Sequence, residues 1–283
     1  MDTAIVSSVF SMNIRWINSA YKEANMFDII IPCYNSEEYI EKCIESLEKQ
    51  TFLDFDIICI NDHSTDNTFE KVKELAKKYN NIFLEEPKEK VWNGGARNIG
   101  IKRVISKYTL FLDNDDWFND ENCLKSIYET IKENNEPDLV RLSYYCLMGD
   151  NKQLVVLNED NPKDLVNSLY IAPWTKCVKS SKLALFPENT LIEDVVQHIA
   201  QIDNIETVAV CEHPIVVWNR NNTNAASLKE NQHNWNNKRI SSIYRNIADL
   251  MDLECKHDYC EEHRQWRIEC YKNLVKEGKE ETF

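Results

Sequence analysis

Three carboxylates stand within four residues at Asp113-Asn114-Asp115-Asp116, directly after the apolar run Leu110-Phe111-Leu112. Carboxylates this close repel one another and favour a bound cation. Hard oxygen ligands on a short loop suit Mg²⁺ or Mn²⁺, which usually keep water and phosphate oxygens in their coordination sphere. Taken alone, an Asp-x-Asp more often marks a solvated turn before a helix, here one expected near Glu121. The meaning of this acidic loop therefore depends on the rest of the chain.

A second acidic pair, Glu193-Asp194, opens a predicted helix with Val195, Ile199 and Ile202 on one face. A carboxylate within hydrogen-bond reach of a hydroxyl can act as its general base. Acidic residues at a helix start also stabilise the helix through its dipole, which is the alternative interpretation. The pair is a candidate catalytic group.

The elements that must position these residues alternate in type. Buried strands are predicted at Phe27–Pro32, Phe55–Ile60, Asn81–Glu86 and Tyr108–Leu112, with helices between them. Asn35 with Glu38 predicts a capping box at the first helix start, and Gly94-Gly95 opens another helix. Alternating strands and helices imply right-handed crossovers and a largely parallel sheet. This half is predicted to be a doubly wound α/β domain.

The second half predicts a hairpin from Leu139–Leu147 and Leu154–Leu157, then short strands at Thr207–Cys211 and Ile215–Trp218. From residue 235 the sequence is charged and mostly helical in pattern. We expect residues 1–26 to be an N-terminal extension, 27–222 the α/β domain, and 223–283 a helical C-terminal tail.

The composition limits the classes of function. The formal charge of -14 on 283 residues speaks against general nucleic-acid binding, which depends on Lys and Arg neutralising phosphates. No apolar run approaches the roughly 20 residues of a spanning helix, so a cytoplasmic protein is expected, with peripheral membrane contact left open. The ten cysteines are scattered, as reduced buried thiols would be. Only Cys255, His257, Cys260 and His263 crowd together; they match no common zinc module and are better explained as helix-face residues.

Four polar loops each follow a predicted strand or open a predicted helix at what should be one edge of the sheet, where open α/β sheets bind ligands. They are Pro32-Cys33-Tyr34-Asn35, Asn61 to Asp66, Trp92 to Asn98, and Asp113 to Asp116. With these four loops in this order, the chain from Phe27 to Trp218 resembles the family 2 glycosyltransferases. The resemblance implies a GT-A fold, a Rossmann-like α/β/α sandwich with a mostly parallel central sheet.

The resemblance also implies a nucleotide-sugar donor. Pro32 and Tyr34 would lie beside the nucleoside, and Asp62 would accept a hydrogen bond from the base, which favours UDP-sugars. Arg97 would reach the base or phosphates; its alternative is a surface ion pair. The donor-binding residues implied in this way are Pro32, Tyr34, Asn35, Asp62, Arg97, Asp113 and Asn114.

For the reaction itself, the resemblance implies that Asp115, with Asp113, holds Mn²⁺ or Mg²⁺ against the donor diphosphate. Asp194 would be the general base and Glu193 would orient a neighbouring group. One base and direct displacement imply inversion at the anomeric carbon. Trp174 follows Pro173 in the region where family members contact the acceptor, and its indole could stack on a sugar or belong to the core.

One position departs from the family pattern, which commonly has Gly where this chain has His63. If that position requires a positive φ, His is among the residues that tolerate it better. The alternative is a contribution of His63 to donor selectivity.

We therefore predict a metal-dependent, inverting glycosyltransferase whose acceptor is a glycan or a lipid-linked sugar. A protein or modified nucleic-acid acceptor is the alternative, as is an inactive sugar-binding module or an assembly subunit whose tail supports a homo-oligomer or a partner. A nucleotidyltransferase would need a Gly-rich basic loop after the first strand, and the chain has no Gly-x-Gly-x-x-Gly or Walker A sequence.

Overall fold

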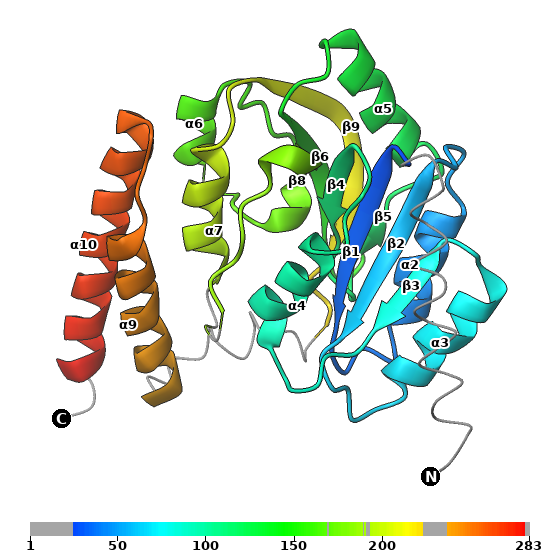
Figure 1. Ribbon diagram of the computed structural model, residues 1–283, viewed down its shortest axis with the longest axis horizontal. Helices are drawn as coiled ribbons and strands as arrows, with labels where there is room; N and C mark the ends of the chain where they lie inside the picture. Colours follow the sequence, from blue (N-terminus) through cyan, green and yellow to red (C-terminus); the bar gives the residue numbers. More distant parts are fainter. Residues whose placement is uncertain (1–24, 169, 189, 191–192, 223–236, 281–283) are drawn as a thin grey trace.

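The computed structural model describes residues 25–280 except 169, 189, 191–192 and 223–236. It forms one mixed α/β molecule around a nine-stranded sheet with the strand order β3-β2-β1-β4-β8-β6-β9-β5, in which β7 pairs with β6 (Figure 1). The strands are β1 Phe27–Cys33, β2 Phe55–Asn61, β3 Ile82–Glu85, β4 Tyr108–Phe111, β5 Trp117–Phe118, β6 Leu139–Met148, β7 Asn151–Val155, β8 Lys176–Lys179 and β9 Val208–Asn219.

The helices connect these strands and flank the sheet. They are α2 Ile40–Glu48, α3 Thr68–Lys78, α4 Trp92–Ile101, α5 Cys123–Glu133, α6 Pro162–Val166, α7 Glu193–Ile202, α9 Asn237–Asp252 and α10 Asp258–Glu280, with short 3-10 turns at Pro173–Thr175 and Ser180–Lys182. In the described residues no helix is both long and apolar enough to cross a membrane.

The predicted parallel sheet is confirmed for the first half of the chain. β1 pairs in parallel with β2 and β4, and β2 with β3. β8 runs antiparallel between β4 and β6, while β6 and β9 are again parallel. The first strands end at one edge of the sheet, so the loops that follow them are neighbours.

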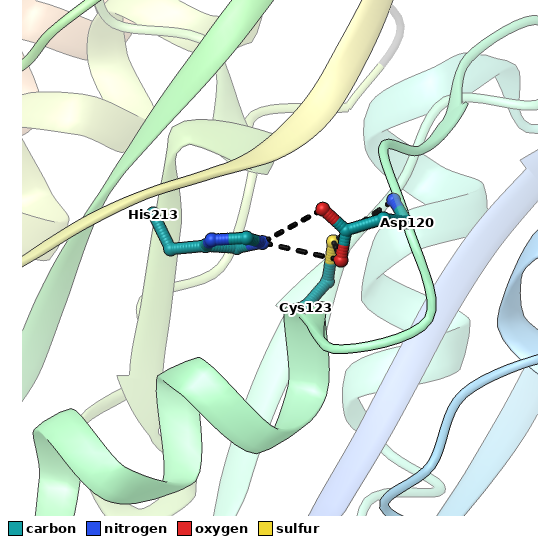
Figure 2. Close-up of side chains that lie close together, drawn as sticks. All are labelled: Asp120, Cys123 and His213. Carbon is teal, nitrogen blue, oxygen red and sulfur yellow. Dashed lines mark hydrogen bonds and ion pairs between the residues drawn. The ribbon is translucent and has the colours of Figure 1, made fainter.

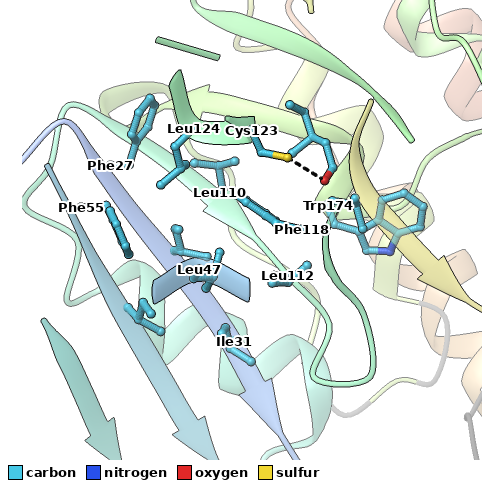
Figure 3. Packing of buried hydrophobic residues seen from close by; sticks show 14 of the residues in the cluster. Phe27, Ile31, Leu47, Phe55, Leu110, Leu112, Phe118, Cys123, Leu124 and Trp174 are labelled. Atoms are coloured by element: carbon cyan, nitrogen blue, oxygen red, sulfur yellow. Dashed lines mark hydrogen bonds between the residues drawn. The ribbon is translucent and has the colours of Figure 1, made fainter. Parts of the chain in front are cut away.

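The central strands read as unbroken apolar runs because both faces of the sheet are covered. Ile29 and Ile31 on β1 face the cluster that includes helices α2 and α5, and Ile30 faces Ala96 of α4. A side chain at Gly100 would collide with Ile30, so glycine lets α4 lie close to β1. Figure 3 shows the first of these clusters.

Two local expectations were wrong. The helix after β1 begins at Ile40, without a side-chain cap, because the Asn35 amide hydrogen-bonds to Thr65 in the next loop instead. The strands expected at Thr207–Cys211 and Ile215–Trp218 are one strand, β9, with a change of register against β6 between Leu142 and Tyr144. The hairpin of β6 and β7 is confirmed.

The C-terminal segment is helical, as expected, and it packs on the rest of the molecule. Figure 1 shows α7 between the sheet and the pair α9 and α10. Ile199 and Ile202 of α7 share a buried cluster with Leu250 of α9 and Ile268 of α10. Thr190 donates a hydrogen bond to the buried Asn246 of α9 at 2.9 Å. The two helices therefore support the helix that carries Glu193 and Asp194. The proposed boundaries at 26 and 222 adjoin residues outside the described part.

Candidate active site

The polar loops at the edge of the sheet are joined by side-chain to backbone hydrogen bonds. The Asn114 amide donates to the carbonyl oxygen of Pro32 at 2.8 Å, which ties the acidic loop after β4 to the loop after β1. The Asn35 carboxamide oxygen accepts from the Thr65 N–H at 2.7 Å, which ties the loop after β1 to the loop after β2. Pro32, Asn35 and Asn114 are thus brought together as predicted, in roles that shape the loops.

Asp62 organises the start of α4. Its two carboxylate oxygens accept hydrogen bonds from the N–H groups of Val91 at 2.6 Å and Trp92 at 2.9 Å. The Lys90 ammonium lies 4.0 Å from Asp62 Oδ2 and 3.0 Å from the centre of the Tyr34 ring. A hydrogen bond from a nucleobase N–H to the Asp62 carboxylate stays a prediction. Lys90 places a cation beside Tyr34. The sequence analysis did not identify this residue, because it stands in a charged loop without a recognisable motif.

Several non-glycine residues with left-handed backbone lie at this edge. Asn35, His63 and Trp92 have φ of 46°, 58° and 62°. The position that the family usually gives to Gly therefore does have a positive φ, which accounts for the departure at His63. Strained backbone of this kind clusters at functional sites, and here it lies in three neighbouring loops.

Arg97 joins the acidic loop after β4 to the acidic pair on α7. Its guanidinium is 3% exposed, and it donates to Asp113 Oδ1 at 2.8 Å and to Glu193 Oε1 at 2.6 Å. Asp194 Oδ1 lies 3.6 Å from the same guanidinium. A side chain at Gly94 would collide with the Pro187 carbonyl oxygen, so glycine allows α4 to approach this segment. The alternative of a surface ion pair is wrong, because the pair is buried.

The charges around Arg97 are strongly coupled. Burial alone would lower the pKa of Arg97, but the carboxylates of Asp113, Asp194 and Glu193 outweigh it and raise that pKa. Burial, with Asp194 nearby, raises the pKa of Glu193 to about 7 although Arg97 opposes the rise. Burial also raises the pKa of Asp194, with Arg97 again opposing. One guanidinium thus holds three carboxylates in place.

The two acidic residues of α7 differ in access. The Glu193 side chain is 7% exposed and hydrogen-bonded to Arg97, whereas the Asp194 side chain is 34% exposed and only within ion-pair distance of it. A general base must reach a substrate hydroxyl. Asp194 is therefore the better placed of the two for that role, and Glu193 for orienting Arg97.

Asp115 and Asp116 of the acidic loop have no cation as partner among the described residues. Asp115 accepts a hydrogen bond from the Asn222 amide at 2.7 Å, and burial together with Asp113 raises its pKa. Asp116 accepts from the Asn219 N–H at 2.8 Å, while its Oδ2 is buried without a partner there. Burial and Asp115 raise the pKa of Asp116.

This donor set fits a divalent cation. Asp113 is ion-paired with Arg97, whereas Asp115 and Asp116 have no cation as partner in the described part of the chain, and Asp115 is the less buried of the two. Hard carboxylate oxygens suit Mn²⁺ or Mg²⁺. Asp115 would be the ligand, with Asp113 facing both Arg97 and the donor. Asn222, at the end of an Asn-rich run, is a partner of Asp115 that the sequence analysis missed.

Trp174 belongs to the core. It is 4% exposed and packs edge-on against Tyr144, with ring centroids 4.8 Å apart, and against Trp218. Figure 3 shows Trp174 among the buried residues of the core. A sugar cannot stack on an indole that side chains already cover. The acceptor role expected for Trp174 is therefore wrong, and the core alternative holds.

Two buried basic residues beside the 3-10 turn Pro173–Thr175 were not predicted. Arg141 of β6 is fully buried and donates to Thr175 Oγ1 at 2.6 Å. Lys176 is 2% exposed and donates to the carbonyl oxygens of Ile171 at 2.7 Å and Ala172 at 3.0 Å. These bonds fix the segment before β8. The sequence did contain a signal for Arg141, because this basic residue interrupts an otherwise apolar strand.

In the part of the chain that the structure describes, the cysteines and histidines of the tail do not form one metal-binding group, although His257 and Cys260 both hydrogen-bond to Asp203. His257 Nδ1 lies 3.1 Å from Asp203 Oδ1, and His263 Nδ1 lies 3.0 Å from Asn167 Oδ1. Among the described residues, the metal-binding types that do converge are Asp120, Cys123 and His213. Cys260 and His263 lie on α10, as expected of helix-face residues, whereas Cys255 and His257 lie in the connection between α9 and α10, so the expectation is wrong for those two.

Comparison with known proteins gives a consistent result. Residues 28–168 match the family model for glycosyl transferase family 2. A poly(ribitol-phosphate) beta-glucosyltransferase of Bacillus spizizenii is 35% identical over 144 residues, which are 50% of this chain and 22% of that protein. An uncharacterised glycosyltransferase of Mycoplasma genitalium is 26% identical over 205 residues, 68% of this chain and 67% of that protein. The chain thus spans about a fifth of the first relative's length.

Solved structures share the fold. Staphylococcus aureus TarS in complex with UDP-GlcNAc superposes with a TM-score of 0.69 at 21% identity, covering 87% of this chain and 71% of that one. A Pyrobaculum calidifontis mannosyltransferase in complex with GDP-Man and Mn²⁺ gives a TM-score of 0.55 at 14% identity, covering 95% and 83%. The expected GT-A type of sandwich with a mostly parallel sheet is confirmed.

Proposed function

The chain belongs to glycosyl transferase family 2, and from that premise we propose that it transfers a sugar, with inversion, from a UDP-sugar to an acceptor hydroxyl. The observation that carries the proposal is the buried Arg97 bridge between Asp113 and Glu193, which lie 80 residues apart in the chain. It joins a donor-side acidic loop and an acceptor-side acidic pair in one site, as a transfer between two substrates requires.

On the donor side, Tyr34 and Lys90 offer a ring and a cation beside Asp62, which would accept a hydrogen bond from the uracil N–H. Asp115 would hold Mn²⁺ or Mg²⁺, and Asp113 would face the ribose or the same ion. The bound cation supplies Lewis-acid stabilisation of the charge that develops on the departing diphosphate. TarS binds UDP-GlcNAc and resembles this chain more than the mannosyltransferase that binds GDP-Man does, which supports a uridine donor over a guanosine donor.

On the acceptor side, Asp194 would take the proton of the attacking hydroxyl while the hydroxyl oxygen approaches the anomeric carbon. A single base and direct displacement give inversion of that carbon. Arg97 holds Glu193 and so fixes the start of α7, which orients Asp194 at the same time. The ion pair between Arg97 and Asp113 also restricts rotation of the Asp113 side chain. Positioning of this kind is a large part of the rate enhancement in two-substrate reactions.

Relatives that act on poly(ribitol-phosphate) support a hydroxyl-rich surface polymer as the acceptor class. A lipid-linked sugar is the second candidate, supported by relatives named processive diacylglycerol beta-glycosyltransferases. The relatives are longer than this chain or are matched only in part. The acceptor classes proposed here therefore rest on similarity in the shared domain alone.

Release of UDP tests the function directly. We expect one or more members of a UDP-sugar panel to yield UDP and a glycosylated acceptor in the presence of Mn²⁺, and GDP-sugars to yield less. The measurement is UDP formation with polyribitol phosphate and diacylglycerol offered separately as acceptors. Thermal stabilisation by UDP-sugars without turnover on any acceptor would instead support a binding module.

Asp115→Ala should remove metal-dependent donor binding. Loss of an outer partner of a metal ligand typically costs 10–100-fold in metal affinity, so loss of the ligand itself should weaken Mn²⁺-dependent UDP binding by more than about 100-fold. Calorimetric titration of UDP with and without Mn²⁺ measures this. Asp150→Ala is the matched control, because Asp150 is an exposed carboxylate in the turn between β6 and β7. An unchanged titration in Asp115→Ala counts against the metal role.

A further inference from the structure

A second group of metal-binding side chains lies outside the proposed active site (Figure 2). Asp120 stands between β5 and α5, Cys123 is the first residue of α5, and His213 lies in β9. Their ligand atoms all lie within 4.8 Å of one another. The proposed transfer reaction does not use these residues.

Strand pairing brings the three together from distant parts of the sequence. Phe118 of β5 pairs with Val216 of β9, and the Asn119 N–H donates to the Ile215 carbonyl oxygen at 2.8 Å. The chain then turns into α5, so Asp120 and Cys123 face the strand that carries His213. Figure 2 shows the imidazole and the thiol both directed at the Asp120 carboxylate.

The distances agree with one shared ion. His213 Nε2 lies 3.2 Å from Asp120 Oδ1 and 3.0 Å from Oδ2, and Cys123 Sγ lies 3.8 Å from Asp120 Oδ1. Tetrahedral zinc, with bonds of about 2.0 Å to N and O and about 2.3 Å to S, separates N from O by about 3.3 Å and S from O by about 3.5 Å. The third pair of ligand atoms, His213 Nε2 and Cys123 Sγ, lies within 4.8 Å, so binding one ion would draw the imidazole and the thiol closer together.

The surroundings give an ion a route to the ligands. Cys123 is buried, whereas the side chains of His213 and Asp120 are 34% and 36% exposed. A groove of about 510 Å³ reaches Asp120 and is lined on its other side by Glu41 and Glu45 of α2. A thiolate with an imidazole favours zinc over Mn²⁺ or Mg²⁺, so this site and the acidic loop select different ions.

Helix capping explains part of the cluster but not all of it. Asp120 Oδ1 accepts from the Asn122 N–H at 2.9 Å, and the Asp120 N–H points at Cys123 Sγ at 3.5 Å. Serine would serve the second contact at least as well as cysteine, because hydroxyl oxygen is the stronger acceptor. Capping also gives no reason for an imidazole on the opposite strand to face the same carboxylate.

We propose that Asp120, Cys123 and His213 bind one Zn²⁺, with a water molecule as the fourth ligand. The thiol proton of Cys123 leaves to solvent as the sulfur binds the ion. The ion clips the start of α5 to β9, whose far end carries Asn219, the hydrogen-bond partner of Asp116. Its effect is therefore on the stability of the frame around the acidic loop, independent of the transfer chemistry.

Cobalt substitution tests the site. In the full chain, with Mn²⁺ present to fill oxygen-only sites, Co²⁺ should give a thiolate-to-cobalt charge-transfer band that saturates at one equivalent and disappears on adding Zn²⁺. Cys123→Ser, which keeps the capping contact, should lose the band. His213→Gln, which keeps a hydrogen bond to Asp120, should weaken Co²⁺ binding by more than about 100-fold.

Controls make each outcome decisive. Cys270→Ser changes a half-buried cysteine of α10 and should leave the band unchanged. Absence of a band in the unaltered protein, or its persistence in Cys123→Ser, overturns the proposal. If circular dichroism shows that Cys123→Ser does not fold, the His213→Gln variant decides, because His213 is half-exposed. Unchanged Co²⁺ affinity in His213→Gln also overturns the proposal.

Discussion

Asp194→Asn should abolish transfer while leaving donor binding intact. Asparagine cannot take the proton of the acceptor hydroxyl, and loss of a general base typically lowers the rate by about 10²–10⁴-fold. The binding of UDP and Mn²⁺ should stay close to that of the unaltered protein, because Asp194 lies on the acceptor side and the side chain keeps its size. Steady-state UDP release and calorimetric UDP titration, run on the same preparation, measure the two quantities.

Glu193→Gln separates the two members of the acidic pair. Its amide oxygen can still accept from Arg97, so turnover should fall less than in Asp194→Asn. Burial raises the pKa of Asp194 in the unaltered protein. The transfer rate of that protein should therefore rise with pH only above the ordinary pKa range of an aspartate, where Asp194 loses its proton. Equal loss of donor binding and turnover in Asp194→Asn, or a larger fall in Glu193→Gln, would sink the assignment of the base.

Arg97→Gln should have the largest effect on stability. It removes the one guanidinium that Asp113, Glu193 and Asp194 share and leaves their charges facing one another in a buried site. Removing one partner of a buried ion pair typically costs about 3–5 kcal/mol. The loss should be smaller at low pH, because protonation of the carboxylates relieves their repulsion. Urea unfolding at pH 5 and pH 8 measures the difference.

Arg103→Gln is the matched control, because Arg103 follows the same helix and makes a two-point contact with Glu85 at the surface. Its side chain is 44% exposed, and exposed pairs contribute about 0–1 kcal/mol. Arg97→Gln should also reduce turnover, since Asp113 and Asp194 lose their common anchor. A stability loss no larger than that of Arg103→Gln would show that the buried bridge does not hold the site together.

Much of the fold followed from local patterns. The run Phe27 to Ile31 predicted a strand buried on both faces, and β1 lies in the middle of the parallel part of the sheet. Prediction from residue spacing was wrong where a tertiary contact replaced a local one. Asn35 has the right residue type and spacing for a helix cap, yet its side chain pairs with Thr65 of another loop.

The residues of the proposed site could be named from the sequence because their types and order are specific. Their partners could not, because residues far apart in the chain are paired only when the sheet is assembled. Asn222 and Asp115 are an example, with the Asn222 amide 2.7 Å from Asp115 Oδ2. Trp174 is another, since periodicity cannot tell an indole that faces a substrate from one that faces Tyr144.

By itself the sequence determined that an acidic loop follows a buried strand, that an acidic pair opens a later helix, and that the fold is an α/β sandwich. Only the tertiary structure decided how Asp113, Glu193 and Asp194 share their charge, because the energy of a carboxylate depends on which cation lies within a few ångströms of it and on how much water is excluded. Arg97 provides that cation from a helix on a different part of the chain. The acidic loop therefore contains an Asp113 that is paired with Arg97 and an Asp115 that has no cation beside it among the described residues, which is the basis for proposing Asp115 as the metal ligand.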